Sequence, residues 1–220
     1  MQATSPEAAV RAPATRDTYR HGDLRRALLD AGIELARGGG PQAVVLREAT
    51  RRAGVAPNAA YRHFENRQAL LEAVRMAALA AMAQAMEKEV AGVRRARNSA
   101  AYARDCLGAV GAAYIRFAQE ETGLFRAGFA PPEPVEVVRP NPDKAGASGL
   151  NPFELLGAAL DRMVEAGVLS PSRRPGAEYL AWSAVHGLAL LVIDGPLAGM
   201  PRKEIQALGK RLLDMVEKGL

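Results

Sequence analysis

Residues 45–67, VLREATRRAGVAPNAAYRHFENR, contain the pattern that decides the fold expected for this chain. The run that begins at Leu46 has the composition of a short helix, with a small alanine that lets a second helix cross close by. Gly54 can adopt the positive φ that a tight interhelical turn requires, and Pro57 suits the first position of a new helix. We therefore predict a helix-turn-helix unit whose second helix covers residues 58–64.

The exposed residues of this unit point to DNA as its partner. The second helix of a helix-turn-helix enters the major groove and contacts base edges with its first residues. Asn58 is the expected base reader, because its amide can pair with N6 and N7 of adenine, and Tyr61, His63 and Arg67 are expected on phosphates. The complete predicted DNA-binding set is Arg47, Pro57, Asn58, Ala59, Tyr61, Arg62, His63 and Arg67. The alternatives are an αα-hairpin that only packs and, for His63, a structural bond to a backbone carbonyl.

The segment AGVAPNAAYRHFENRQALL resembles the tetracycline-repressor (TetR) family of bacterial transcription regulators, as does the opening YRHGDLRRALLDAGIEL. The resemblance implies an all-α homodimer with an N-terminal DNA-binding domain and a larger C-terminal domain that usually binds an effector. Val45 and Ala56 depart from the family pattern, which often has Thr and a capping residue such as Ser at these positions. One phosphate contact and the side-chain cap of the second helix are therefore in question.

Length and charge distribution fit one small and one medium domain in 220 residues. Residues 19–67 carry nine arginines against five acidic residues, a net charge of +4, which is most of the chain's total of +5. We predict a flexible tail over residues 1–18, the DNA-binding domain over 19–67 and a regulatory and dimerisation domain over 68–220. The single cysteine, Cys106, excludes an internal disulfide and is typical of a cytoplasmic protein.

Helices connected by loops are expected throughout the chain. A first helix should cover residues 23–37 and stop at the glycines that follow it, and a long connecting helix should cover 68–90. Residues 130–150 are rich in proline and glycine and predict a loop. Asn151, Pro152 and Glu154 then give a cap, a first-turn proline and a reciprocal acid, so a helix should start there.

An apolar segment, residues 179–193, contains no formal charge. It is shorter than the ~20 residues of a membrane span, so both of its faces should be buried by protein and no membrane partner is expected. Within it, WSAVHGLALLVIDG resembles the Trp-His-Gly subgroup of TetR-type regulators, and AAYIRFAQEETGLFRAGF resembles the corresponding upstream segment. Trp182 and His186 share one helix face, either as a ligand site or as a core pair.

Two further sets of residues follow from the helical spacing in the C-terminal part. The predicted ligand-binding residues, for a small and mainly apolar effector, are Tyr114, Phe117, Phe125, Phe129, Trp182 and His186. The aromatic stripe is also compatible with ordinary core packing. The predicted dimer interface comprises Ala184, Gly187, Leu191, Leu208, Leu212 and Met215.

The predicted function is that of a ligand-responsive repressor that binds an inverted-repeat, double-stranded DNA operator as a homodimer. No metal site, cofactor or catalytic motif is expected, since the three histidines lie far apart and none of the familiar catalytic patterns occurs. A DNA-binding scaffold dimer without effector is the first alternative. A helical enzyme that uses His186 is the second.

Overall fold

The computed structural model describes residues 21–130 and 142–220, and over these ranges it contains nine α-helices and no strand. The expected all-α class is therefore confirmed. The helices are α1 (His21–Ala43), α2 (Leu46–Arg52), α3 (Pro57–Ala60), α4 (Arg67–Ala91), α5 (Ala100–Glu120), α6 (Thr122–Gly128), α7 (Pro152–Glu165), α8 (Ala177–Ile193) and α9 (Arg202–Gly219). The predicted tail over 1–18 and most of the predicted loop over 130–150 lie outside the described residues.

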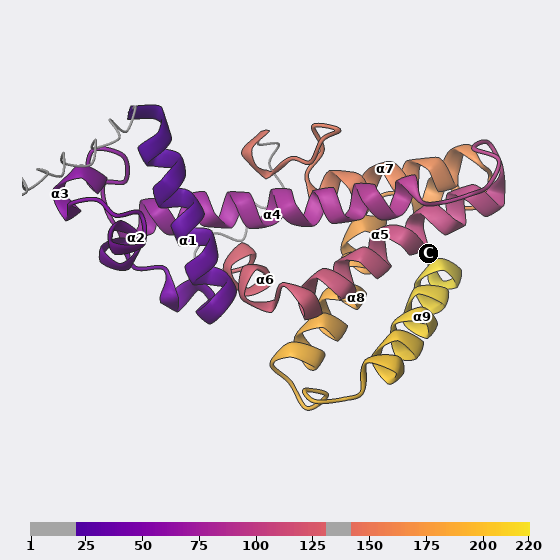
Figure 1. Ribbon diagram of the computed structural model, residues 1–220. Helices are drawn as coiled ribbons and strands as arrows, with labels where there is room; N and C mark the ends of the chain where they lie inside the picture. Colours follow the sequence, from indigo (N-terminus) through magenta and orange to yellow (C-terminus); the bar gives the residue numbers. More distant parts are fainter. Residues whose placement is uncertain (1–20, 131–141) are drawn as a thin grey trace, which may run out of the picture.

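Helices α1, α2 and α3 form a small unit at one end of the molecule (Figure 1). Helical geometry breaks at Gly39 and at Gly40, whose φ of 67° a side chain would strain, and one more turn follows Pro41. Phe64 is buried in the core of the unit, and the guanidinium of Arg25 lies 5.3 Å from the centre of its ring. Apolar packing against α1 therefore holds the helix-turn-helix together.

The second helix of the unit is shorter than predicted. Helix α3 ends at Ala60, and residues 61–63 form a turn in which the amides of His63 and Phe64 both bond to the Ala60 carbonyl. Neither Val45 before α2 nor Ala56 before α3 makes a side-chain cap. As expected from Ala56, helix α3 has no side-chain cap at its first turn.

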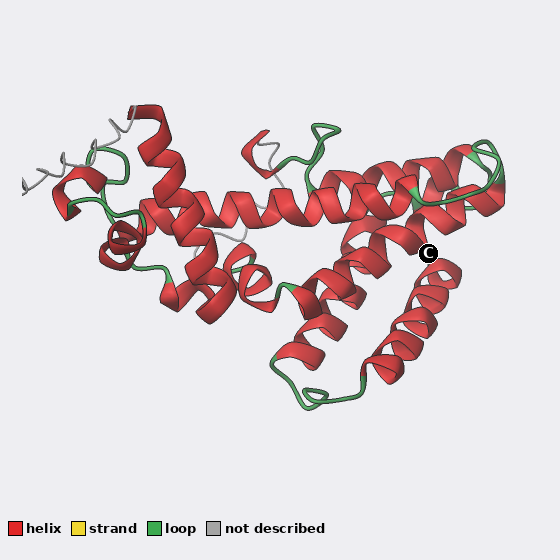
Figure 2. Ribbon diagram, in the orientation of Figure 1, coloured by secondary structure: helices red, strands yellow, loops and turns green. Residues whose placement is uncertain are grey.

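Helix α4 joins the helix-turn-helix end of the molecule to the C-terminal helices (Figure 2). Its first turn is capped by Asn66, whose side chain accepts a hydrogen bond of 2.9 Å from the Ala69 amide, as the sequence predicted. Among the described helices, α4 is the one whose length and composition alone would allow it to cross a membrane. However, 56% of its apolar stretch is buried within the protein. Burial of this kind is typical of a core helix.

The C-terminal helices pack around α5, which contacts α4, α7, α8 and α9. Helix α6 turns back from α5 and contacts both α1 and α4. Helix α7 begins with the predicted capping box, in which Asn151 and Glu154 satisfy each other's backbone amides. Just before it, the amides of Ala147 and Ser148 donate to the Glu87 carboxylate of α4 at 2.8 Å each.

Candidate nucleic-acid interface and ligand cavity

Several of the predicted DNA-binding residues are exposed at the tip of the helix-turn-helix. Pro57, Asn58, Tyr61 and Arg62 are all exposed, and the side chain of Tyr61 is 58% accessible. Ala59 is only half-buried, which leaves part of its methyl group available. An exposed tip with one amide, one phenol and one guanidinium offers the donors that base edges and phosphates accept.

The helix before it, α2, presents further arginines. Arg47 is exposed, whereas Arg51 and Arg52 both pair with the Glu48 carboxylate. The hydrogen bond from Arg51 is the main cause that lowers the pKa of Glu48 to about 2. Part of the positive charge of α2 is therefore neutralised within the helix, and Arg47 remains the candidate for phosphate contact.

Arg67 has a structural role that the sequence did not indicate. Its Nε donates to the Val44 carbonyl at 2.8 Å and its Nη2 to the Pro41 carbonyl at 2.7 Å. These bonds tie the first turn of α4 to the last turn of α1 and to Val44, which follows it. The predicted phosphate contact of Arg67 is not tested by this arrangement, but two of its donors are already in use. His63 is half-buried beside Phe64.

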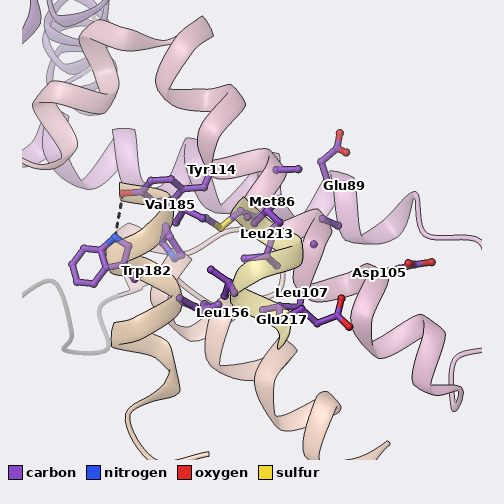
Figure 3. A pocket seen from close by; sticks show the side chains of 18 of the residues that line it. Met86, Glu89, Asp105, Leu107, Tyr114, Leu156, Trp182, Val185, Leu213 and Glu217 are labelled. Atoms are coloured by element: carbon purple, nitrogen blue, oxygen red, sulfur yellow. Dashed lines mark hydrogen bonds between the residues drawn. The ribbon is translucent and has the colours of Figure 1, made fainter. Parts of the chain in front are cut away.

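A cavity of about 620 Å³ lies among the C-terminal helices. Its apolar wall comes from α4, α5, α7, α8 and α9, and includes Leu79, Met86, Leu107, Val110, Leu156, Val185 and Leu213. Figure 3 shows Trp182 and Tyr114 on one side of it, with Glu89 and Asp105 on the other. The volume lies within the range of roughly 300–1,000 Å³ typical of small-molecule sites.

Three of the predicted ligand-binding residues line this cavity and three do not. Tyr114, Phe129 and Trp182 belong to its wall. Phe117, Phe125 and His186 are absent from the wall, and Phe117 and Phe125 are buried in the core. The helical spacing placed all six on suitable faces, but it could not show that α7 and α9 supply part of the cavity wall and that α6 supplies none.

The aromatic residues form a hydrogen-bonded cluster behind the cavity wall. Trp182 Nε1 donates to the Tyr114 hydroxyl at 3.1 Å, and that hydroxyl lies 2.6 Å from His186 Nδ1. Burial raises the pKa of Tyr114 and lowers the pKa of His186, so both groups are neutral at pH 7. The cluster supports the wall on which Trp182 and Phe129 lie.

Cavity residues that periodicity did not single out include Lys144 and Asn151, both buried. Asn151 was predicted as a helix cap alone. Its position in the cavity wall depends on where α7 lies against α4 and α5, for which the sequence holds no local signal.

The predicted interface residues lie on a partly exposed side of α8 and α9. On α8, Leu180, Ser183, Gly187 and Leu191 are exposed at intervals of three and four residues, with Ala184 half-buried beside them. On α9, Met215 is 60% exposed, and Leu208 and Leu212 are half-buried. An uncharged, partly exposed stripe at helical spacing is typical of an interface.

No group of three or more metal-ligating side chains that could hold an ion occurs within residues 21–130 and 142–220.

Comparison with known proteins relates both halves of the chain to one family. Residues 28–74 match the model of bacterial regulatory proteins of the tetR family, and residues 107–216 match that of a tetracyclin repressor-like C-terminal domain. Neither description names a Trp-His-Gly domain, so membership of that subgroup stays a prediction. No curated protein matches the chain.

Among solved structures, a Rhodococcus sp. protein of unknown function is 27% identical and has a TM-score of 0.71, with 93% of this chain and 99% of that chain covered. FadR from Bacillus subtilis, in complex with stearoyl-CoA, is 14% identical with a TM-score of 0.61 and coverages of 89% and 98%. PfmR from Thermus thermophilus, a TetR family transcriptional regulator, is 19% identical with a TM-score of 0.56 and coverages of 88% and 98%. With both domain models matched in order, this chain belongs to the TetR family of bacterial regulatory proteins.

Proposed function

We propose that the protein is a ligand-responsive repressor that binds an inverted-repeat operator as a homodimer and releases it when a small, mainly apolar molecule occupies the cavity. The DNA contacts would come from α3, the turn after it and the start of α2, with Asn58 on a base edge and Arg47, Tyr61 and Arg62 on phosphates. The effector would lie against Tyr114, Phe129 and Trp182.

The observation that carries this proposal is the course of α4. Its first residue, Arg67, is bonded to the end of α1 and to Val44. Its second half supplies Leu79, Met86 and Glu89 to the cavity. A helix of 25 residues is about 37 Å long. A ligand that displaces the cavity end of α4 therefore has a rigid connection to the DNA-binding end.

Helix α6 offers a second connection between the C-terminal helices and the DNA-binding end. The Arg126 guanidinium donates to Asp194 at the end of α8, and Arg37 of α1 donates to Glu121 at 3.0 Å. Gly123 lies so close to α1 that a Cβ atom there would be 2.1 Å from the Ala36 carbonyl oxygen. Phe129, which follows α6, lines the cavity, so the ligand would contact both connections.

Two alternatives predict different features. A scaffold dimer without effector predicts a filled C-terminal core, which a cavity of about 620 Å³ disfavours. An enzyme that uses His186 needs this ring near bound substrate, but His186 is absent from the cavity wall and its Nδ1 is hydrogen-bonded to the Tyr114 hydroxyl. The structural neighbour FadR, solved with stearoyl-CoA, supports a ligand site in a fold of this kind.

The test is a footprint on DNA upstream of the protein's own gene and its neighbours, repeated with a library of small apolar molecules. We expect a protected inverted repeat whose halves lie about one DNA turn apart, and loss of protection with at least one compound class. To release the DNA usefully, a ligand must favour the non-binding state by a few kcal/mol, on the order of 5 for nearly complete release. A protected sequence without two-fold symmetry would argue against the proposal. So would a footprint that stays unchanged in the presence of a compound that the protein is shown to bind.

A further inference from the structure

One polar group in the cavity wall has no partner within the protein. The side chain of Asn151 is 1% exposed, and its Nδ2 is the one buried side-chain nitrogen or oxygen within the described residues that makes no hydrogen bond. Asn151 belongs to the wall of the cavity. Native proteins satisfy nearly all such groups, so an orphaned amide beside a cavity points to a partner that arrives with a ligand.

The orientation of this amide follows from the local structure. Asn151 Oδ1 accepts from the amides of Phe153 at 2.9 Å and Glu154 at 3.0 Å, which only an oxygen can do. The two amide atoms are thus not interchangeable, and Nδ2 must point away from the helix cap. It offers N–H donors and no acceptor.

Charged side chains also lie in this wall, among them Glu89, Asp105 and Lys144. The side chain of Lys144 is 2% exposed and also lines the cavity. Between Lys144 and Asn151, the amides of Ala147 and Ser148 are bonded to Glu87 of α4. A ligand group held by Asn151 would therefore bind next to a segment that is attached to the connecting helix.

We propose, building on the ligand-responsive function above, that the effector is amphipathic: an apolar body fills the cavity and a carbonyl-type oxygen accepts a hydrogen bond from Asn151 Nδ2. A carboxylate and a ketone share this acceptor chemistry. An amine, which only donates, would leave Nδ2 unsatisfied. Head-group selectivity would then come from Asn151, while Leu107, Leu156 and Val185 bind the body without discrimination.

Three probes with apolar chains of similar length test this head-group preference without DNA: decanoic acid, 2-decanone and decylamine. The chain's single tryptophan, Trp182, lies in the cavity wall, so its fluorescence reports occupancy directly. We expect the wild-type protein to bind both oxygen-headed probes about tenfold or more tightly than decylamine.

The decisive variant is Asn151→Asp. An aspartate keeps the oxygen that caps α7, so the helix start is preserved, but it replaces the donor with an acceptor. The affinity for both oxygen-headed probes should fall about tenfold or more, while that for decylamine should stay equal or rise. The matched control is Glu154→Gln, which weakens the other half of the capping box outside the cavity and should leave all three affinities unchanged.

Equal binding of the three probes to the wild-type protein would overturn the inference without any variant being made. So would an Asn151→Asp protein that keeps the oxygen-headed preference, or a Glu154→Gln protein that loses it. If the preference exists but no probe affects operator binding, the ligand-responsive repressor fails and this site stands. If no probe binds while an operator is still protected, the site fails and the DNA-binding function stands.

Discussion

Asn58 and Arg62 are neighbours on the exposed tip of the helix-turn-helix, but they should act on different parts of DNA. The variant Asn58→Ala should cost ~1–3 kcal/mol per half-site on the best operator and little on random DNA, because it removes a base contact. The variant Arg62→Ala should weaken both DNAs alike and reduce the log-log salt slope by about one per chain. Salt titrations on both DNAs distinguish the two roles. A change of sequence preference with Arg62→Ala alone would reverse our interpretation.

For Arg67, the hydrogen bonds to the Val44 and Pro41 carbonyls predict an effect that needs no DNA. The variant Arg67→Ala should lower the free energy of unfolding by ~1–3 kcal/mol, since two carbonyls lose a charged donor. Urea unfolding of the free protein measures this loss. Arg62→Ala serves as the control and should leave stability nearly unchanged. If Arg67→Ala is as stable as wild type but binds DNA poorly, the phosphate contact matters and the internal bonds do not.

His186 should make stability depend on pH. Burial lowers its pKa in the folded protein, whereas the unfolded chain has the ordinary value near 6.5. The unfolded state therefore binds more protons below about pH 6.5, and the free energy of unfolding should decrease as the pH falls from there toward the lowered pKa. The variant His186→Gln can still accept from Tyr114 and should lose this part of the pH dependence. Urea unfolding of the wild type and of this variant at about pH 7.5 and about pH 5.5 measures the difference. If the variant keeps the pH dependence of the wild type, His186 is not its source.

At the scale of elements, the close contact of α6 with α1 requires a glycine. A Cβ atom on Gly123 would lie 2.1 Å from the Ala36 carbonyl oxygen and 2.5 Å from that of Arg37, and neither backbone oxygen can move freely. We expect Gly123→Ala to destabilise the protein by ~1–3 kcal/mol in chemical unfolding. The control is Gly108→Ala in α5, where a Cβ meets nothing within 4 Å and the better helix propensity should stabilise by ~0.5–1 kcal/mol. Two equal effects would mean that α6 is not in tight contact with α1.

For the whole molecule, the exposed apolar sides of α8 and α9 predict an isologous dimer. Met215 is 60% exposed in the single chain, so Met215→Glu should leave the protomer folded but place a charge on each side of the two-fold axis. The dimer should weaken about 100-fold or more, because a buried unpaired charge costs several kcal/mol. Sedimentation and operator binding should both report this loss.

The matched control for the dimer is Gln206→Glu, an exposed position of α9 about 160° around the helix from Leu208, which introduces the same charge. It should remain dimeric. A Met215→Glu protein that stays dimeric, or a monomer that binds one half-site as tightly as the dimer binds two, would contradict both the interface and the need for a symmetric operator.

The sequence by itself determined the all-α class, the helix-turn-helix and the starts of several helices. Asn66 and Asn151 cap the helices expected of them, and the glycines after the first helix break its geometry where predicted. Caps, glycines and prolines act on backbone groups within a few residues, so their effects are present in any tertiary setting. The family resemblance rests on the same local patterns.

Only the tertiary structure decided which of these residues meet. His186 and Phe125 have the same helical spacing as the cavity residues but lie outside its wall, and the Asn151 cap faces a cavity that no local pattern indicates. Arg67 donates to the Val44 and Pro41 carbonyls, which lie more than twenty residues away in the sequence. Periodicity tells which side of a helix is apolar, but the neighbour that covers that side depends on crossing angles and side-chain volumes summed over several helices.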